Sequence, residues 1–266
     1  MLKINNLSKT FNAGTANEKK ALQNIDLELK KGDFVTVIGS NGAGKSTILN
    51  MIAGAFMMDC GSILLDGENI SLYPEYKRAR LIGRVFQDPM LGSASDMNIE
   101  ENLAMANRRG KRRGLRWGIA HHEEALFKDK LKGLDLGLEE RLKTKIGLLS
   151  GGQRQAITLL MASLQQPKLL LLDEHTAALD PKTASKVLNL TQEIVEEQQL
   201  TTFMVTHNMK DAIKYGNRLI MMHDGKIILD ISGEQKKSLS VSDLLERFEQ
   251  TIGSTIDDDE ILLSNK

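Results

Sequence analysis

The chain has 266 residues, of which 41% are hydrophobic and 26% charged, a composition typical of a globular protein with a sizeable core. Because 35 basic side chains balance 35 acidic ones, the chain has no overall field that would draw it to nucleic acid or anionic lipid. Its single cysteine excludes an intramolecular disulfide, and no apolar run reaches the roughly 20 residues that span a bilayer.

Short β-branched runs alternate with helical patterns, which predicts an α/β fold with a largely parallel sheet. The chain starts with a strand-like segment and lacks the long apolar stretch of a signal peptide, so a cytosolic location is expected. Strands are predicted at 25–29, 34–38, 63–65, 169–172, 203–206, 218–222 and 226–231, and helices at 46–53 and 182–198.

The stretch from about residue 88 to 148 differs from the rest, since it is rich in helix formers and charge and poor in β-branched runs. We interpret it as a helical subdomain inserted into a main domain of residues 1–233. A basic cluster at 108–116 within it is read as a solvated face, or else as a contact for a partner or lipid headgroup. Residues 234–266 have a short helical pattern and an acidic run, which predicts a C-terminal helix and a tail.

The phosphate-loop pattern G-x-x-x-x-G-K-[ST] lies between a predicted strand and a predicted helix, the context that it requires. Its glycines would let backbone N–H groups point at phosphate oxygens. Lys45 would place a charge at the β- and γ-phosphates, and Ser46 would offer a hydroxyl to Mg²⁺. The residues of this nucleotide-binding loop are Gly39, Ser40, Asn41, Gly42, Ala43, Gly44, Lys45, Ser46 and Thr47.

An apolar strand ends at two consecutive carboxylates, Asp173 and Glu174. Ligands bind at the carboxyl ends of strands in open α/β sheets, so Asp173 would help to hold Mg²⁺, most simply through a water molecule. Glu174 is placed to polarise an attacking water molecule. The alternative is that Glu174 only caps the helix that follows.

A second phosphate-binding device is the run Leu-Ser-Gly-Gly-Gln at residues 149–153. Ser150, Gly151 and Gly152 would present a hydroxyl and bare N–H groups at the start of a helix, which is an anion-binding surface. The chain therefore holds two phosphate-binding devices but one complete phosphate loop.

With these motifs in this order, residues 1–233 resemble the nucleotide-binding subunit of an ABC transporter. The resemblance implies the P-loop NTPase fold of ABC ATPases, with a mixed sheet core and an inserted helical subdomain, and the use of ATP and Mg²⁺. It implies that Gln87 contacts Mg²⁺ and the water, that Asp180 couples two sites, and that His207 contacts the γ-phosphate. Phe11 would stack on adenine, with core packing as the alternative. Residues 149–153 are called the signature run from here on, and Gln153 is its last residue.

In this family the signature run of one subunit closes over the ATP held by the phosphate loop of another, so a homodimer is expected. The resemblance also implies integral membrane permease subunits, an extracellular substrate-binding protein, and a place on the cytoplasmic face of the membrane. No nucleic-acid partner is expected. Four residues near Gln87 are candidates to line a groove for the permease, with packing inside the insertion as the alternative: Met90, Leu91, Met97 and Leu103.

The predicted function is ATP hydrolysis that powers the uptake of a small molecule through separate permease subunits. The run from Asp173 to Pro181 is similar to that of ATPases for amino-acid uptake, such as that of tryptophan or tyrosine. The alternatives are an exporter ATPase subunit and a soluble ABC ATPase that acts on ribosomes or DNA.

Overall fold

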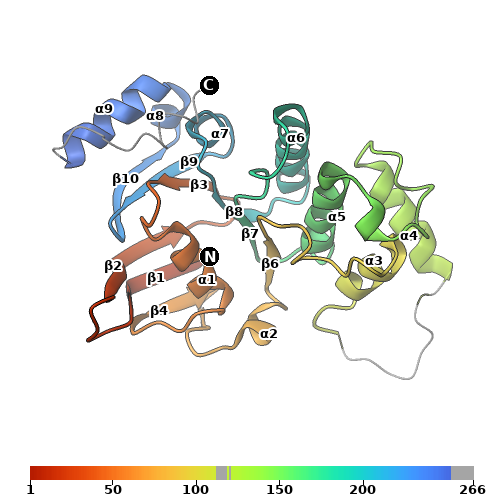
Figure 1. The fold of residues 1–266 in the computed structure, drawn as a ribbon, viewed down its shortest axis with the longest axis horizontal. Coiled ribbons are helices and arrows are strands. Elements are labelled where there is room, and N and C mark those ends of the chain that lie inside the picture. The colour runs from red at the N-terminus through yellow and green to blue at the C-terminus, as the bar shows by residue number, and fades with distance from the viewer. Residues whose placement is uncertain (112–118, 120, 253–266) are drawn as a thin grey trace. The chain divides into compact units, whose positions relative to one another are not determined.

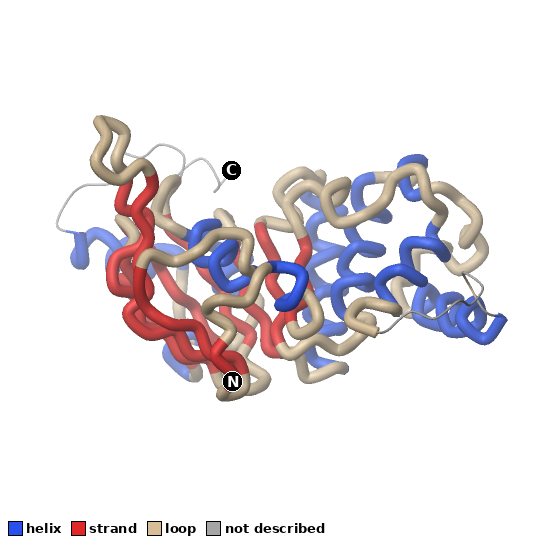
Figure 2. Tube along the Cα trace, turned by 90° about the horizontal axis from the view of Figure 1, so that it is seen from below, coloured by secondary structure: helices blue, strands red, loops and turns tan. Residues whose placement is uncertain are grey.

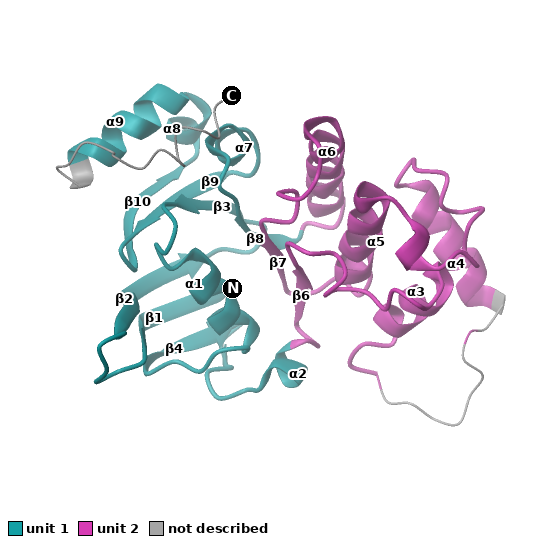
Figure 3. Ribbon diagram, in the orientation of Figure 1, with its two compact units in different colours: residues 1–78, 200–266 teal, residues 79–199 magenta. Residues whose placement is uncertain are grey.

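The computed structural model describes residues 1–111, 119 and 121–252. The chain divides into two compact units, shown in different colours in Figure 3. The first unit consists of residues 1–78 and the chain from residue 200 onward, and the second consists of residues 79–199. Among the described residues, no helix combines the length and the apolar composition that a membrane-spanning helix needs.

The first unit contains an antiparallel sheet in the order β2-β1-β4-β5. Its strands are β1 (Leu2–Phe11), β2 (Lys19–Leu29), β4 (Cys60–Leu65) and β5 (Glu68–Asn69). Leu2 and Ile4 of β1 are buried, while Lys3 between them is exposed, as expected when alternate residues face the core.

The same unit contains a second group of strands in the order β10-β9-β3-β8. These are β3 (Phe34–Gly39), β8 (Thr201–Val205), β9 (Arg218–His223) and β10 (Lys226–Ser232). Strands β8 and β9 both run parallel to β3, whereas β10 is antiparallel to β9. The carboxyl ends of β3, β8 and β9 therefore meet at one edge, where α/β sheets place their ligands.

The helices of the first unit are α1 (Lys45–Ala53), α2 (Glu75–Arg78), α7 (Met209–Lys214), α8 (Glu234–Lys237) and α9 (Val241–Ile252). Figure 1 shows α9 against β10 with α7 beside it. Helix α9 buries Leu244 and Phe248 against Ile38 and Met221 of the strands. The acidic run at 257–260 lies outside the described residues.

The second unit joins a parallel strand pair to a set of helices. Strands β6 (Ile82–Val85) and β7 (Leu169–Asp173) pair in register, with Val85 opposite Leu172. The helices are α3 (Ile99–Asn107), α4 (His121–Lys132), the short 3-10 helix η1 (Ile146–Leu148), α5 (Gly151–Ser163) and α6 (Pro181–Glu197). Helix α5 packs between α3 and α6, and Figure 2 shows these helices in blue.

The predicted strands and helices are all present, although several are longer than predicted. Two of the features that were not predicted concern the sheets. One is strand β6, which is short and whose run Ile-Gly-Arg-Val shows no clear alternation of apolar and polar residues. The other is the antiparallel sheet of β1, β2, β4 and β5, which departs from the expectation of a largely parallel sheet. The core is a mixed one, as the family resemblance implied.

Part of the basic cluster is internal rather than solvated. Arg108 forms an ion pair with Glu123 at 2.6 Å, and Arg109 donates a hydrogen bond to the carbonyl oxygen of Met161 at 2.6 Å. The reading of a solvated face is therefore wrong for these two residues. The other arginines of the cluster, at positions 112, 113 and 116, lie outside the described residues.

Candidate functional site

The phosphate loop lies between β3 and α1 of the first unit, the strand and helix expected on either side of it. Lys45 is the first residue of α1, and its side chain is buried. Its Nζ donates to the carbonyl oxygen of Gly39 at 2.6 Å and to that of Ser40 at 3.0 Å. These two bonds hold the ammonium group against the backbone of the loop, where it can attract a phosphate.

Two glycines of the loop leave no room for a side chain. A Cβ on Gly39 would lie 2.1 Å from the carbonyl oxygen of Met222, and a Cβ on Gly44 would lie 2.5 Å from that of Ala21. Gly44 also has a φ of 100°, in the left-handed region. Strands β9 and β2 therefore approach the loop so closely that only glycine fits at these two positions.

The donors of the loop fit a phosphate group. Gly44 is the N-cap of α1 and has no side chain that could accept from the first helical turn. The N–H groups at the start of a helix have no partner within the helix and lie at the positive end of its dipole. Together with the ammonium group of Lys45 they form a cradle for the phosphates of a nucleotide.

His207 lies at the same sheet edge as the phosphate loop. It follows β8, whose Val205 pairs with Val37 of β3, and the N–H of the adjacent Thr206 donates to the carbonyl oxygen of Val37 at 3.0 Å. The side chain of His207 is exposed, so it can reach a ligand at this edge. The first unit thus brings His207 and the loop together, as the family resemblance implied.

Phe11 is the last residue of β1 and is half-buried. Its ring packs edge-to-face against Phe56, with 5.5 Å between centroids, and Lys9 Nζ lies 5.6 Å from its centroid. Its cross-strand partner is Lys19, whose Nζ lies 2.9 Å from where a Cβ on Gly42 would be. Phe11 therefore packs against another aromatic ring, that of Phe56. It also lies opposite Lys19, whose side chain reaches the phosphate loop.

Two side chains at the loop were not found from the sequence. Lys19 brings a second ammonium group to Gly42, and His223 at the end of β9 places Nδ1 3.5 Å from the hydroxyl oxygen of Ser40. Lys19 precedes the loop by twenty positions and His223 follows it by more than 170. No local motif marks either residue, because the tertiary packing of segments far apart in the chain brings them to the loop.

Asp173 ends β7 in the second unit and is paired with a residue on the neighbouring strand. Arg84 of β6 donates from Nη2 to Asp173 Oδ2 at 3.4 Å, and its guanidinium lies 4.4 Å from the ring centroid of Phe86. Burial raises the pKa of Asp173 above its ordinary value, whereas the charge of Arg84 acts to lower it. Arg84 thus supports the ionised form of this carboxylate, and no sequence motif had pointed to it.

Glu174 has an unusual backbone conformation, with a φ of 43°. A non-glycine residue in the left-handed region costs of order 1 kcal/mol or more, and such residues gather at functional sites. Helix α6 begins at Pro181 and is capped by Asp180, so the alternative that Glu174 caps the next helix is wrong. The conformation instead turns the chain sharply at the end of β7.

His175, next in the chain, belongs to the core. It is 2% exposed, and its Nε2 lies 3.1 Å from the hydroxyl oxygen of Thr191 in α6. Burial lowers the pKa of His175 to about 4, so the ring is neutral at physiological pH. This hydrogen bond ties the turn after Glu174 to α6 and explains a histidine at this position.

Gln87 leaves β6 at the same edge where Asp173 leaves β7, because the two strands are parallel and in register. Its side chain is exposed. The preceding residue, Phe86, accepts a hydrogen bond through its carbonyl oxygen from Nε2 of Gln155 in α5, at 3.3 Å. The second unit therefore brings Gln87, Asp173 and Glu174 to one edge of the strand pair. The hydrogen bond from Gln155 links that edge to α5, the helix that begins in the signature run.

The signature run forms the start of α5, as predicted. Ser150 is the N-cap, its hydroxyl oxygen accepts from the N–H of Gln153, and Gln153 Oε1 accepts from the N–H of Ser150, both at 3.3 Å. This capping box leaves the N–H groups of Gly151 and Gly152 without an intrahelical partner. Gly151 is exposed, so its N–H remains available to an anion, whereas Gly152 is buried in the isolated chain.

The signature run packs against the segment that contains Asp180. A Cβ on Gly152 would lie 2.1 Å from Cγ2 of Thr183, and one on Gly151 would lie 3.2 Å from Cδ2 of Leu179. Asp180 is the N-cap of α6 and accepts from the N–H of Thr183 at 3.1 Å. Hydrogen bonds from the side chain and then from the backbone N–H of Thr183 lower the pKa of Asp180. Asp180 therefore has a structural role beside any role in coupling.

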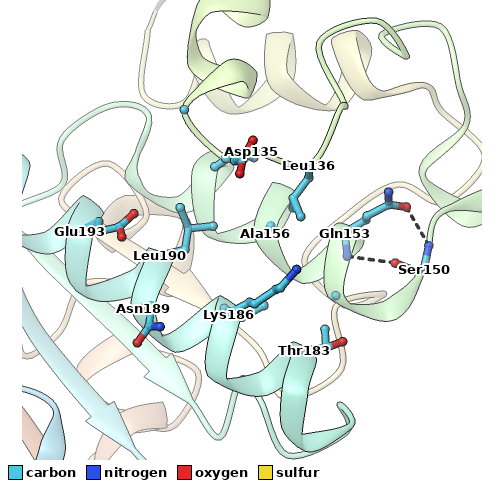
Figure 4. A pocket seen from close by; sticks show the side chains of 14 residues that line it. Asp135, Leu136, Ser150, Gln153, Ala156, Thr183, Lys186, Asn189, Leu190 and Glu193 are labelled. Atoms are coloured by element: carbon cyan, nitrogen blue, oxygen red, sulfur yellow. Dashed lines mark hydrogen bonds between the residues drawn. The ribbon is translucent and has the colours of Figure 1, made fainter.

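A cavity of about 430 Å³ borders the signature run on the side that faces α6 (Figure 4). Ser150 and Gln153 of α5 line it together with Thr183 and Lys186 of α6. The sequence did not predict this cavity. It leaves the start of α5 less tightly enclosed than the rest of the helix, which is buried almost throughout.

The three residues expected at the metal provide only oxygen donors, the ligands that Mg²⁺ prefers. Ser46 in the first unit has an exposed hydroxyl, and in the second unit Gln87 has an exposed amide and Asp173 a half-buried carboxylate. The chemistry of this donor set fits Mg²⁺, which keeps several water molecules and needs few protein ligands.

The residues expected to line the permease groove divide into two kinds. Leu103 is 0% exposed and belongs to the core of the second unit, so for this residue the expectation of a groove is wrong. Met90 and Leu91 are 40% and 70% exposed, and Met97 is intermediate. Met90 and Leu91 remain available to a partner.

Comparison with known proteins identifies the family of this chain. The family model described as ABC transporter matches residues 22–177. The chain is 46% identical over 252 residues to a tyrosine transport ATP-binding protein of Clostridioides difficile (strain R20291), an alignment that covers 95% of this chain and 100% of that protein.

Solved structures of ATP-binding cassettes share the fold. One, a dimeric cassette in a post-hydrolysis state bound to ADP and Pi, is 30% identical with a TM-score of 0.74 and covers 87% of this chain and 98% of its own. Another, the ADP conformation of a cassette of an ABC transporter, is 27% identical with a TM-score of 0.76. The match covers 96% of this chain and 99% of that chain. This chain therefore belongs to the ABC transporter family, in which it is an ATP-binding and ATP-hydrolysing subunit with the P-loop NTPase fold.

Proposed function

We propose that this chain powers the uptake of an amino acid, with tyrosine or a related aromatic amino acid as the substrate. The observation that carries the proposal is the identity of 46% with a tyrosine transport ATP-binding protein over the whole length of that protein. The subunit that hydrolyses ATP does not select the substrate, so the substrate class rests on this relative and not on any residue of the site.

At the nucleotide, the first unit would hold the β- and γ-phosphates with the loop of residues 39–47 and the ammonium group of Lys45. Ser46, Gln87 and Asp173 would hold Mg²⁺, which would neutralise charge on the phosphate oxygens. Glu174 would accept a proton from the attacking water molecule, and His207 would contact the γ-phosphate.

Each chain carries one phosphate loop and one signature run, which supports a homodimer with two composite sites. In such a dimer the N–H groups at the start of α5 and the hydroxyl of Ser150 would contact the ATP that is held by the partner's loop. Asp180 and Gln153 lie beside those donors and would join the same interface. A cassette with 30% identity is dimeric in its solved structure, which supports the same arrangement.

The remaining partners follow from the transport function. Membrane permease subunits would dock near the exposed side chains of Met90 and Leu91, at the cytoplasmic face of the membrane. An extracellular substrate-binding protein would deliver the amino acid. We also propose residues 1–233 as the ATPase domain, with a helical subdomain at about 88–148 and a C-terminal extension from 234. In that subdomain the described elements are α3, α4 and η1, all helical.

The proposal is tested by uptake of radiolabelled tyrosine in cells that lack this chain, complemented with wild type or with Glu174→Gln. Uptake is expected with the wild type and not with the variant, and excess unlabelled tyrosine should suppress it. Loss of tyrosine efflux instead of uptake would favour an exporter. Recovery of the chain with ribosomes and without a polytopic membrane protein would contradict transport altogether.

A further inference from the structure

The C-terminal helix α9 reaches the end of β3 where the phosphate loop begins. Leu244 and Phe248 of α9 are 0% and 5% exposed and pack into a hydrophobic cluster that contains Ile38 of β3. Ile38 directly precedes Gly39, the first residue of the loop. Helix α9 is thus part of the packing that supports the loop.

The ring of Phe248 contacts a histidine that itself contacts the loop. The rings of Phe248 and His223 meet edge-to-face, with 5.6 Å between centroids and an interplanar angle of 83°. His223 Nδ1 lies 3.5 Å from the hydroxyl oxygen of Ser40, and the carbonyl oxygen of Ser40 accepts from Lys45 Nζ at 3.0 Å. A short series of contacts therefore runs from Phe248 to the lysine of the phosphate loop.

Phe248 also shares a cavity with His207, the residue expected to contact the γ-phosphate. The cavity has a volume of about 20 Å³ and is lined by Phe248, His207 and Gly39, together with apolar side chains of the same unit. It has space for about one water molecule, so the surrounding side chains are close to native packing density. Removing the aromatic ring would enlarge this space, which His207 also lines.

We propose that Phe248 is a positioning residue for ATP hydrolysis, which acts through His207 and His223 and touches no nucleotide itself. The inference rests on the proposed nucleotide site. Without the ring, both imidazoles gain room for other rotamers, while the hydrogen bonds that hold Lys45 are made by backbone carbonyls and persist. Turnover should therefore respond more strongly than ATP binding.

The test compares three variants of the full-length chain. Phe248→Ala removes the ring, and Phe248→Leu restores most of the apolar volume. The matched control is Leu245→Ala, because Leu245 lies on the same helix and packs against the same cluster but does not line the cavity. Urea unfolding of each variant separates a loss of folded protein from a loss of rate.

We expect Phe248→Ala to lower kcat about tenfold with KM within about twofold, because a displacement of about 1 Å remote from the chemistry can cost up to about a hundredfold. Phe248→Leu should recover most of the rate, and Leu245→Ala should stay within about twofold of wild type. Combined with His207→Ala, the Phe248→Ala change should cost less than it does alone, since one of the two imidazoles through which it acts is already absent.

Histidine resonances give a readout that does not depend on activity. The chain has five histidines, so a spectrum of protein labelled only at histidine is simple to assign by substitution. The signals of His207 and His223 should move in Phe248→Ala and stay in place in Leu245→Ala. The loss of the ring should also move the His223 signal in Phe248→Leu, which keeps the test valid if the alanine variant does not fold.

Two outcomes would overturn the inference in different ways. If kcat and both histidine signals of the Phe248 variants match those of Leu245→Ala, Phe248 only fills the core and the nucleotide site stands. If His207→Ala hydrolyses ATP at the wild-type rate, the proposed site is wrong at this residue and the inference fails with it.

Discussion

Replacement of Gly152 by alanine tests whether the signature run is glycine-rich for packing as well as for anion binding. In α5 the new Cβ would lie 2.1 Å from Cγ2 of Thr183 in α6, far inside van der Waals contact. Overpacking of this kind costs about 1–3 kcal/mol, and alanine returns about 1 kcal/mol through its better helix propensity. The expected net loss of unfolding free energy is about 1 kcal/mol.

The clash involves a single methyl group, which makes it possible to relieve. Thr183→Ser removes Cγ2 but keeps the N–H that donates to Asp180, so the cap of α6 is preserved. The double variant should regain most of the stability that Gly152→Ala loses, a coupling that a double-mutant cycle measures directly. Gly151→Ala is the matched control, because its Cβ would meet only the flexible end of Leu179, at 3.2 Å.

Urea unfolding of the purified chain, followed by circular dichroism, provides the free energies. The reasoning is refuted if Gly152→Ala is as stable as Gly151→Ala, or if Thr183→Ser lowers the stability of Gly152→Ala further. Either result would mean that α5 and α6 do not pack at this distance. The glycine would then be needed only for access of the nucleotide to the N–H groups.

The other predictions concern the chemistry and one buried lysine. Glu174→Gln should keep ATP binding but lower hydrolysis by about a hundredfold or more and trap an ATP-bound dimer, as measured by phosphate release and gel filtration; near-normal turnover would contradict the role of Glu174. Ser150→Arg should reduce hydrolysis to below about a tenth while the monomer still binds ATP, because the phosphate loop of the same chain is untouched; loss of binding by the monomer would argue against a site shared between chains. Burial lowers the pKa of Lys236 from 10.5 to about 8. Between these two pH values the folded state binds fewer protons than the unfolded state, so the free energy of unfolding should rise with pH in that range. This rise, followed by urea unfolding at pH 8 to 10, should vanish in Lys236→Met but persist in Lys237→Met, whose side chain is exposed; a pH-independent wild type would be the contrary result.

The parts of the site that the sequence predicted are those whose geometry is local. The capping box of Ser150 and Gln153 spans four residues, and the phosphate loop nine, so the chemistry of each can be worked out from neighbouring positions. Strands such as β7 and β8 could also be predicted from the sequence, because a largely apolar run is typical of a strand covered on both faces.

Contacts made by strand pairing could not be predicted in this way. Arg84 meets Asp173 only because β6 and β7 are parallel neighbours, although 89 positions separate the two residues. His223 reaches Ser40 because β9 pairs with β3, whereas Lys19 reaches Gly42 through packing between the two sheets of the first unit. A single sequence carries no information on strand order, so these residues had no signal that could have marked them.

The left-handed backbone of Glu174 shows how the local and the distant contributions combine. The residue lies directly after Asp173, whose carboxylate is held by Arg84, and directly before His175, whose ring is held by Thr191 of α6. The hydrogen bonds of its two neighbours prevent Glu174 from relaxing to a more favourable backbone conformation. These bonds therefore offset the free-energy cost of its φ of 43°. It follows that His175 and Arg84 contribute to the position of the proposed general base without any contact with the nucleotide. The histidine that follows the two carboxylates is therefore explained by the turn that it anchors.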